Sequence, residues 1–363
     1  MHTKSVPCLP MRLLAIETSC DDAGAAIVEG NSLLAPVKIL AEQVASQVDL
    51  HNHYGGVFPE LAAREHFATV LPAIEAALKQ LDPNADPRDT LRALDGIAVT
   101  AGPGLIGSLL MGVTAAQTLG LAFKKKLIPV NHMAGHVLST WLDDAEHFGS
   151  STVPQFPLLA LTVSGGHTQL VWMEALGKFQ VLGKTRDDAA GEAFDKVSIM
   201  LGLGYPGGPA MQQAAAAWNK TGERPDVPRP MIHDGLEFSF SGLKTSVRYW
   251  LDKHPDADKN AVAHEVQAAI VDILTTKTLR ALDDFPAAGV ILAGGVAANQ
   301  PLRDALTKAL TNRGVPLHIP SRKHATDNAA MIGAAAIGML EHGFVPVAPE
   351  MVDARSSWPL TDW

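Results

Sequence analysis

Two histidines four residues apart are the first residues whose spacing predicts chemistry. The segment HMAGH places His132 and His136 on one face if it is helical, and two imidazoles at that spacing can chelate one divalent metal ion. Two ordinary surface or hydrogen-bonded histidines would give the same pattern, so the pair needs a third ligand. The zinc-protease motif H-E-x-x-H has a glutamate base after the first histidine, where this chain has Met133. A metalloprotease interpretation therefore lacks its base.

The third ligand is predicted far along the chain. The segment ATDNAAMIGAAA carries Asp327 immediately before a predicted helix. Thr326 or Asp327 would also make a good helix N-cap, which is the simpler explanation when the segment is taken alone. Two histidines and one carboxylate leave coordination positions open, and this set suits Fe(II) as well as Zn(II).

Three glycine turns have the composition of anion-binding or nucleotide-binding loops. They are SGGH at 164–167, YPGGP at 205–209 and AGGVAAN at 293–299. Gly165 and Gly166 allow backbone N–H groups to approach an anion closely. The segment 293–299 follows a buried strand and opens a helix, whose dipole favours a negative ligand. Each turn taken singly is more often a plain tight turn, but the three together favour a nucleotide site.

An acidic segment lies between the first two of these turns. In DDAAGEAFDK (187–196), a helix would place Asp188, Glu192 and Asp195 on one face. A solvated acidic face is the simplest interpretation. Beside glycine turns, a carboxylate could instead bind ribose hydroxyls or the ammonium group of an amino acid.

An internal repeat organises the elements that must position these residues. Residues 13–30 and 158–174 each have the pattern of a hairpin, and 96–120 and 289–306 each have a buried strand, a glycine turn and an amphipathic helix. We therefore expect two duplicated α/β lobes with a ligand cleft between them. Helical spacing predicts helices over 58–80, 262–282 and 328–340, and Pro and Gly predict loops at 202–209 and 224–235.

The repeat also predicts domain boundaries. The first lobe is expected at 11–139 together with about 326–345, and the second at 140–325, with an insertion at about 184–255. Residues 1–10 and 346–363 are expected to be terminal tails without an assigned function.

Composition limits the class of protein. With 47% hydrophobic and 18% charged residues, the chain is predicted to be globular. The apolar stretch at 109–123 is too short to span a bilayer, and the N-terminus lacks a signal-peptide pattern. Cys8 and Cys20 are too few for a disulfide framework. We expect a cytoplasmic location and no membrane partner.

The net charge of −9 argues mildly against a nucleic-acid partner, because phosphate contacts require Lys and Arg. Two local basic segments exist, Lys124 to Lys126 and Arg224 to Arg229, and solvated surface charge is the simplest explanation for either. Composition by itself does not indicate an RNA substrate.

The motifs taken together resemble one family. The order ETSCDD, YGGVFPELAAREH, AGPGLIGSLLMG, NHMAGH, VSGGHTQL, DDAAGEAFDK, GYPGGP, FSFSGLKT, AGGVAAN and TDNAAMI is similar to that of TsaD, the tRNA N6-adenosine threonylcarbamoyltransferase family. The resemblance extends from Arg12 to about Gly343. It implies the α/β fold of actin, Hsp70 and the sugar kinases, with two duplicated lobes around a nucleotide cleft.

The resemblance also implies an activity and partners. The enzyme would transfer threonylcarbamoyl from threonylcarbamoyl-adenylate to N6 of adenosine 37 in tRNAs that read codons beginning with adenine. TsaB and TsaE would be its protein partners. The metal, usually iron, would be held by His132, His136 and Asp327. The substrate-binding residues would be Thr162, Val163, Ser164, Gly165, Gly166, Asp195, Gly208 and Asn299. Some members have an acidic residue shortly after PGGP, where this chain has Gln212 and Gln213.

Several alternatives remain open from the sequence. Glu17 is a candidate for positioning or proton transfer, although an ordinary structural carboxylate would look the same. No serine or cysteine is accompanied by an obvious base, so direct transfer without a covalent enzyme intermediate is the simpler hypothesis. A small-molecule kinase on the same fold, a metalloprotease and a non-catalytic nucleotide-binding regulator are the competing functions.

Overall fold

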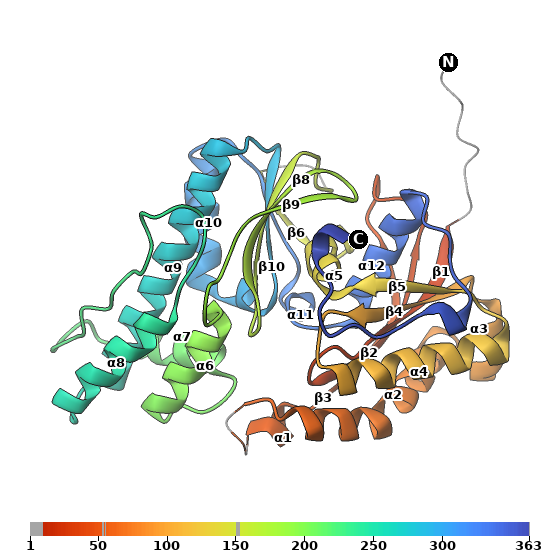
Figure 1. Ribbon diagram of the computed structural model, residues 1–363, viewed down its shortest axis with the longest axis horizontal. Helices are drawn as coiled ribbons and strands as arrows, with labels where there is room; N and C mark the ends of the chain where they lie inside the picture. Colours follow the sequence, from red (N-terminus) through yellow and green to blue (C-terminus); the bar gives the residue numbers. More distant parts are fainter. Residues whose placement is uncertain (1–9, 53, 55, 150–152, 363) are drawn as a thin grey trace. The chain divides into compact units, whose positions relative to one another are not determined.

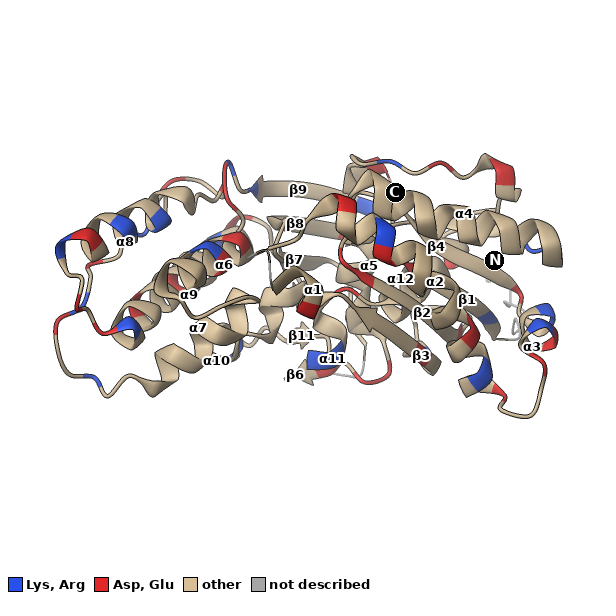
Figure 2. Cartoon of the chain, turned by 90° about the horizontal axis from the view of Figure 1, so that it is seen from below, with Lys and Arg blue, Asp and Glu red and all other residues tan. Residues whose placement is uncertain are grey.

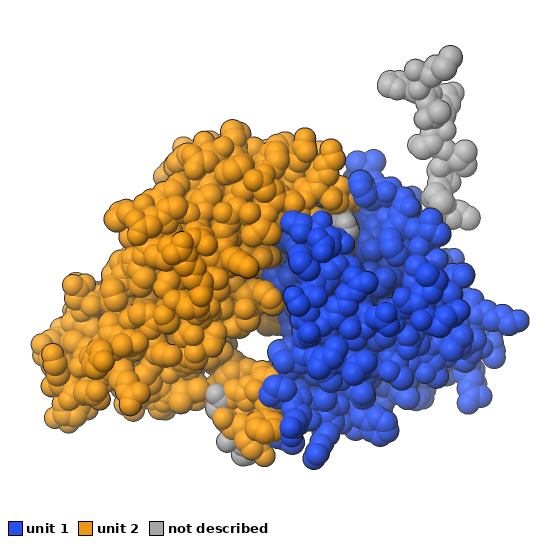
Figure 3. All heavy atoms as spheres, in the orientation of Figure 1, with its two compact units in different colours: residues 1–47, 59–145, 327–363 blue, residues 48–58, 146–326 orange. Residues whose placement is uncertain are grey.

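The computed structural model of the chain describes residues 10–52, 54, 56–149 and 153–362 (Figure 1). Within this part, the chain divides into two compact units (Figure 3). The first unit comprises residues 10–47, 59–145 and 327–362, and the second comprises the remainder. Cys8 and all of the expected tail at 1–10 except Pro10 lie outside the described residues. The domain boundaries expected from the repeat stay a prediction.

The first unit is built on a five-stranded sheet in the order β3-β2-β1-β4-β5. Its strands are β1 (Met11–Glu17), β2 (Asp22–Gly30), β3 (Lys38–Ser46), β4 (Gly96–Gly102) and β5 (Leu127–Asn131). The β1–β2 and β2–β3 pairs are antiparallel, whereas β4 runs parallel to both β1 and β5. The hairpin predicted at 13–30 is confirmed.

Helices cover both faces of this sheet, which explains why β1 and β4 are almost continuously apolar. The helices of the unit are α2 (Pro59–Leu81), α3 (Pro87–Ala93), α4 (Ile106–Phe123), α5 (His132–Leu138) and α12 (Ala329–Glu341). Alternate residues of β2 face opposite layers: Ile27 belongs to the core with α2 and α4, whereas Val28 packs on Gly333 of α12. The helices expected at 58–80 and 328–340 are confirmed.

Helix α4 differs from expectation in length. It starts at Ile106, before the apolar stretch, and its 18 residues carry no charge (Figure 2). Its mean hydropathy is 1.5, so the helix, which is longer than the stretch 109–123, is long and apolar enough to cross a bilayer by length and composition only, as core helices of globular proteins also can be. One-third of the helix is buried, and it packs against β4 and α2.

The second unit repeats the same strand order. Its sheet runs β6-β11-β10-β7-β8-β9, from β6 (Glu146–Phe148), β7 (Leu158–Val163), β8 (Thr168–Ala175), β9 (Lys178–Lys184), β10 (Gly289–Ala293) and β11 (Leu317–Ile319). Strands β7 to β11 have the order and directions of β1 to β5, and β6 is added at the edge. The predicted duplication of an α/β lobe is therefore confirmed.

The helices of the second unit are α1 (Val48–Asn52), α6 (Ala190–Leu201), α7 (Gly207–Ala217), α8 (Ser241–Lys253), α9 (Lys259–Asp284), α10 (Gln300–Thr311) and α11 (Arg322–Ala325). The helix expected at 262–282 and the loop at 224–235 are confirmed. The loop expected at 202–209 is wrong at its end, because α7 already begins at Gly207. Gly and Pro are tolerated there, since the N–H groups of a first helical turn need no intrahelical acceptor.

Candidate functional site

The two histidines lie on the short helix that follows β5. Asn131 caps this helix, because its Oδ1 accepts hydrogen bonds from the backbone N–H groups of Met133 at 2.9 Å and Ala134 at 3.3 Å. All seven residues of α5 are buried. His132 and His136 are one turn apart, with ring centroids separated by 4.6 Å. The helical spacing expected from HMAGH is confirmed.

Asp327 lies beside both imidazoles. Its Oδ1 is 3.6 Å from Nε2 of His132 and 3.1 Å from Nε2 of His136. The N-cap of α12 is Asn328, whose side chain accepts from Met331 N at 2.8 Å. The N-cap role expected for Thr326 or Asp327 is therefore wrong. Since Asn328 caps the helix, the carboxylate of Asp327 is directed to the histidines.

The three side chains fit a divalent metal ion. Ligands at about 2.0–2.2 Å from a metal lie about 2.8–3.6 Å from one another in octahedral or tetrahedral geometry, which includes the distances above. Both ring nitrogens of His136 are buried and have no hydrogen-bond partner within the described part of the chain. The contact of His136 with Asp327 is close but lacks hydrogen-bond geometry. A metal ion would give Nε2 of His136 the partner that no hydrogen bond provides.

The buried carboxylate of Glu17 orients His132 by contacting Nδ1, the ring nitrogen that does not face Asp327. Glu17, at the end of β1, is 0% exposed, and its Oε2 lies 3.1 Å from Nδ1 of His132. The same oxygen accepts the hydroxyl of Thr100 on β4 at 2.6 Å, and Ser19 Oγ is 3.0 Å from Nδ1. An acceptor at Nδ1 keeps a proton there, so Nε2, on the side of Asp327, is the nitrogen that would bind a metal ion once its own proton is displaced.

Sequence reasoning missed Ser19 and Thr100. Thr100 was detectable only as the single hydroxyl residue in the otherwise apolar strand GIAVTAG.

Charge and burial oppose each other in this cluster. Burial alone raises the pKa of Glu17, but the charge and hydrogen bond of His132 outweigh it, and the pKa falls below its usual value. Burial alone lowers the pKa of His132, but the carboxylates of Asp327 and then Glu17 raise it to about 9. In the metal-free protein His132 is therefore an imidazolium at neutral pH. Since a metal binds neutral imidazole, metal binding must displace this proton.

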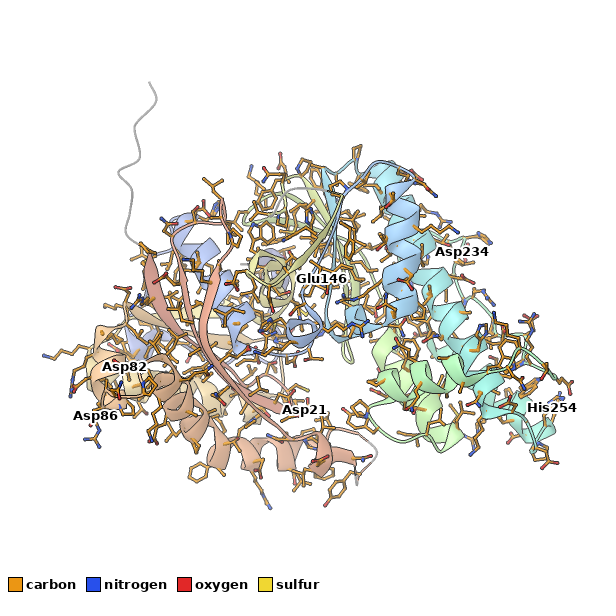
Figure 4. All side chains as sticks on the ribbon, turned by 180° about the vertical axis from the view of Figure 1, so that it is seen from behind. Asp21, Asp82, Asp86, Glu146, Asp234 and His254 are labelled. Atoms are coloured by element: carbon orange, nitrogen blue, oxygen red, sulfur yellow. The ribbon has the colours of Figure 1, made fainter. Side chains whose placement is uncertain are left out.

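Cys20 lies close to the same cluster. Its sulfur and carboxylate oxygens of Asp21 and Asp327 lie within 4.8 Å of one another, and Figure 4 labels Asp21 at the β1–β2 turn. Burial, followed by the charges of Asp21 and Asp327, raises the pKa of the Cys20 thiol well above its usual value. A protonated thiol is both a poor nucleophile and a poor ligand.

The β1–β2 turn is held in place by two other sequence motifs. His66 of α2 is fully buried, and its Nε2 lies 3.0 Å from the carbonyl oxygen of Cys20. A Cβ on Gly104 would lie 2.5 Å from the carbonyl oxygen of Ser19, so glycine is required there for close backbone approach. The segments YGGVFPELAAREH and AGPGLIGSLLMG therefore fix the turn that supplies Ser19 to the site.

The SGGH turn joins β7 to β8 in the second unit. Ser164 N donates to His167 O at 2.7 Å, and His167 N donates to Ser164 Oγ at 3.2 Å. Gly165 and Gly166 are exposed, and a Cβ on either would meet no described atom within 4 Å. Neither glycine is needed for packing, which is the pattern expected where an external ligand must approach the backbone.

The other predicted substrate segments pack around this turn. β10 pairs with β7 so that Ala293 lies opposite Thr162, and a Cβ on Gly294 would lie 2.4 Å from Val163 O. At the start of α6, a Cβ on Gly191 would lie 2.5 Å from Ser164 O. The backbone contacts thus bring AGGVAAN and the α6 segment to the end of β7.

Asp195 and Asn299 have structural partners. Asp195 Oδ1 accepts from Gly207 N at 2.7 Å and so holds the PGGP turn, while the position of Gly208 is open. Asn299 caps α10 by accepting from Leu302 N at 3.1 Å, and its amide donates to Gln267 at 3.0 Å.

The expected acidic helix face is wrong. Asp188 precedes α6, which begins at Ala190, so the three carboxylates do not share one helical face. Asp188 and Glu192 both pair with Lys196, at 2.9 and 2.7 Å. Asp187 instead accepts the hydroxyls of Ser239 and Ser241 at 2.6 and 2.7 Å, which ties down the FSFSGLKT segment.

The two basic segments are also largely engaged. Lys125 Nζ donates to the carbonyl oxygens of Arg92 and Leu94, and thereby closes the end of α3. Arg224 pairs with Glu265 at 2.7 Å, and Arg229 pairs with Asp272 at 2.8 Å. Lys125, Arg224 and Arg229 therefore have fixed partners, whereas Lys124 and Lys126 are exposed, as expected for solvated surface charge.

One cavity in the second unit has no counterpart in the sequence motifs. Helices α7, α9 and α10 line an open pocket with a volume of about 590 Å³. Its lining includes Gln212, Trp218, His264, Gln267 and Gln300. Gln212 accepts from Gln300 N at 2.7 Å, and the rings of Trp218 and His264 lie 4.6 Å apart. Through Gln267, this cavity adjoins Asn299.

Comparison with known proteins identifies relatives of this chain. Residues 38–334 match the family model of TsaD, tRNA N6-adenosine threonylcarbamoyltransferase. Proteins of that name from Variovorax paradoxus and Albidiferax ferrireducens are 42% and 43% identical to it. The alignment with the first relative covers 96% of this chain and 96% of that relative. The alignment with the second covers 97% of this chain and 99% of that relative.

A solved structure, HypF of T. kodakarensis, is similar in fold alone. It has 13% identity and a TM-score of 0.57, over 96% of this chain and about half (51%) of HypF. This likeness agrees with the expected actin-like α/β fold. Because the family match covers most of the chain and the relatives align over nearly their full length, the chain belongs to the tRNA N6-adenosine threonylcarbamoyltransferase family.

Proposed function

We propose that this chain transfers the threonylcarbamoyl group from threonylcarbamoyl-adenylate to N6 of adenosine 37 in tRNAs that read codons beginning with adenine. The full-length similarity to enzymes of that name carries the proposal. The convergence of His132, His136 and Asp327 supports it, because a metal centre on this fold is not needed by a small-molecule kinase. Met133 at the position of the protease base disfavours peptide hydrolysis. Because the acceptor is tRNA, we also propose a cytoplasmic location.

His132, His136 and Asp327 are proposed to hold one divalent ion, with Fe(II) expected from the family resemblance and Zn(II) compatible with the same ligands. When bound, the ion supplies Lewis-acid polarisation of the donor's carbonyl group. Glu17 is proposed as a positioning residue, since it contacts a ligand rather than an open position. Of the two roles considered for Glu17 from the sequence, positioning and proton transfer, we propose positioning.

The donor is proposed to bind along the second unit. The backbone of Thr162, Val163, Ser164, Gly165 and Gly166 would receive the phosphate, because the two exposed glycines leave it accessible. The residues proposed at the nucleoside are Asp195, Gly208 and Asn299. The cavity beside Asn299 offers amide and aromatic groups of the kind that bind a purine base.

The reaction is an acyl transfer that needs no enzyme nucleophile. The N6 amine forms the new C–N bond, the C–O bond to the adenylate breaks, AMP departs with the electron pair, and N6 loses a proton. Because AMP is a good leaving group and N6 is a weak nucleophile, the protein's main contribution is to position the two reactants. The protonated thiol of Cys20 favours this direct route.

Protein partners are proposed because this chain offers little positive surface to tRNA. Residues 1–47, 59–145 and 327–363 contain 11 Lys and Arg against 19 Asp and Glu, and residues 48–58 and 146–326 contain 18 against 19. On α8 both signs are interspersed (Figure 2). Most cations of the two basic segments are paired, as described above. We propose that TsaB and TsaE supply the remaining affinity.

An exposed apolar surface on the first unit offers a place for such a partner. Helices α2 and α4 meet where Ala63 approaches Gly107. Near this contact, Phe67 is 82% exposed, Leu71 57%, Ile106 48% and Leu110 45%. Contiguous exposed apolar side chains of this kind mark protein interaction sites. We propose that TsaB docks on this two-helix surface.

The test is transfer of labelled threonylcarbamoyl to unmodified tRNA, together with mass spectrometry of tRNA nucleosides from cells depleted of the protein. His132→Ala and Asp327→Ala should abolish stoichiometric metal in elemental analysis, and they should abolish transfer. His342→Ala, at an exposed histidine, is the matched control. Unchanged nucleosides in depleted cells would refute the proposed reaction. Full metal content in both variants would refute the ligand assignment alone.

A further inference from the structure

The C-terminal segment returns across the first unit after α12. Val347 pairs with Leu127 at the start of β5 through hydrogen bonds of 2.9 and 3.0 Å. Further along, Val352 is buried, and its carbonyl oxygen accepts from the side chain of Gln117 on α4 at 2.9 Å. Figure 1 shows this segment in dark blue beside β4 and β5. It is therefore a packed part of the unit, not the terminal tail that the sequence suggested.

The segment then crosses the ends of β4 and β5. Arg355 N donates to Ala101 O at 2.7 Å, and Ser356 O accepts from Gly104 N at 3.3 Å. A Cβ on Gly102 would lie only 2.0 Å from Arg355 O, so the two backbones are in direct contact. Because β4 and β5 are parallel, their carboxyl ends lie at the same edge of the sheet, where α5 begins.

Asn131 connects this segment to α5. It is 0% exposed, and its Nδ2 donates to the carbonyl oxygen of Trp358 at 3.0 Å. Its Oδ1 is thereby left facing Met133 N and Ala134 N, which it caps. The Trp358 carbonyl thus sets the orientation of the amide that starts the helix.

We propose that residues 352–358 form a strap that positions α5, and with it His132 and His136, through Asn131. The inference rests on the metal site proposed above. An isolated helix of seven residues is unstable, so its placement depends on its caps and on packing. Asn131 is a positioning residue in this account, since it contacts neither imidazole through a hydrogen bond in the described structure.

Two variants test the strap, one a substitution in the full-length protein and the other a chain shortened at its C-terminus. Asn131→Asp retains an N-cap acceptor but loses the donor to Trp358 O and sets a carboxylate against that carbonyl. A chain ending at Ala354 removes the Trp358 carbonyl itself. Gln117→Met is the matched control, because it removes a similar side-chain bond to the segment at Val352, six residues before Trp358, and leaves the bond to Asn131 in place.

Metal affinity is measured with chelator-buffered Zn²⁺, and site geometry is measured by the visible spectrum of the Co²⁺ form. Both strap variants should bind Zn²⁺ about tenfold more weakly, the scale seen when groups behind metal ligands are removed. Their Co²⁺ spectra should also change. Gln117→Met should alter neither measurement, even if its melting temperature falls. Wild-type affinity and spectrum in both strap variants would overturn the proposal.

Amide hydrogen exchange of the metal-free protein separates the strap from the metal site. The strap variants should lose protection at residues 133–138 while α2 keeps its protection. Unchanged protection in α5 would overturn the strap. If the wild type binds no metal but the variants lose α5 protection, the strap stands and the proposed metal site fails.

Discussion

Replacing Glu17 by glutamine tests whether the buried carboxylate tunes the metal site. The change keeps the size of the side chain and removes its negative charge. In the structure, Oε2 faces Nδ1 of His132 and the hydroxyl of Thr100, while Oε1 accepts from Ser19 N. Glutamine has only one side-chain oxygen, so it can accept hydrogen bonds either on the side of His132 and Thr100 or on the side of Ser19 N.

The magnitude follows from these contacts. A hydrogen bond to a charged group contributes about 1.5–3 kcal/mol and a neutral one about half of that, so weakening the bond to His132 costs about 1 kcal/mol. An amide N–H facing Ser19 N would leave a buried donor unpaired, which costs about 1–3 kcal/mol more. The two costs add to about 2–4 kcal/mol, so we expect a metal affinity lower by roughly 30- to 700-fold.

The comparison must be made as a function of pH. Because the pKa of His132 in the metal-free protein is about 9, metal affinity of the wild type should rise about tenfold per pH unit from 7 to 9 and then level. Without Glu17, the imidazolium loses one of its two stabilising carboxylates, so the curve should level at lower pH. The deficit of the variant should therefore be larger at pH 9.5 than at pH 7.

Chelator-buffered Zn²⁺ titration gives the affinities, and calorimetry in two buffers of different ionisation enthalpy counts the displaced protons. The wild type should release about one proton from His132 at pH 7. Glu42→Gln changes a buried carboxylate on β3 and serves as the control. Equal limiting affinities of the Glu17 variant and the wild type at pH 9.5 would refute the positioning role.

Three further predictions address the donor site, stability and partner binding. Gly166→Val should keep the melting temperature, because a Cβ there meets no described atom, but should abolish donor binding in calorimetry; unchanged affinity would move the site elsewhere. Burial and then His147 lower the pKa of His318 to about 4. Between about pH 6.5 and 4 the unfolded chain therefore binds a proton on His318 that the folded chain does not, so the free energy of unfolding should fall by up to about 3 kcal/mol as the pH falls through this window. His318→Leu should flatten that dependence in urea unfolding, and an unaltered slope would contradict it. The isolated chain should transfer poorly, and TsaB and TsaE should restore turnover; Phe67→Asp should remove this gain, whereas efficient turnover by the chain alone would refute the partner requirement.

The local architecture could be predicted because its signals are local. Alternating and helical apolar spacing located the hairpins and long helices, and the repeated pattern anticipated the shared strand order of the two sheets. The same holds for His132 and His136, whose relation depends only on the geometry of one helix. The exposed glycine turn at 165 and 166 could also be predicted from local sequence, since neither glycine is needed for packing against a distant segment.

The partners of these residues were decided by tertiary structure. Asp327 could have capped its own helix, and only the capping by Asn328 leaves its carboxylate for the histidines. Lys125 has the same charge as its neighbours, but it lies over the end of α3, where its ammonium group donates hydrogen bonds to backbone carbonyl oxygens. Sequence spacing does not determine which of several possible acceptors a polar group will meet.

The sequence by itself determined the family motifs, the repeated α/β elements and the pair of imidazoles on one helix. Only the folded chain decided that Glu17 and Thr100 lie behind His132, and that the C-terminal segment meets Asn131. Periodicity records which face of an element is buried, because burial acts on each residue within its own helix or strand. Hydrogen bonds between distant segments depend instead on how the strands and helices pack, since a shift of about 1 Å makes or breaks them.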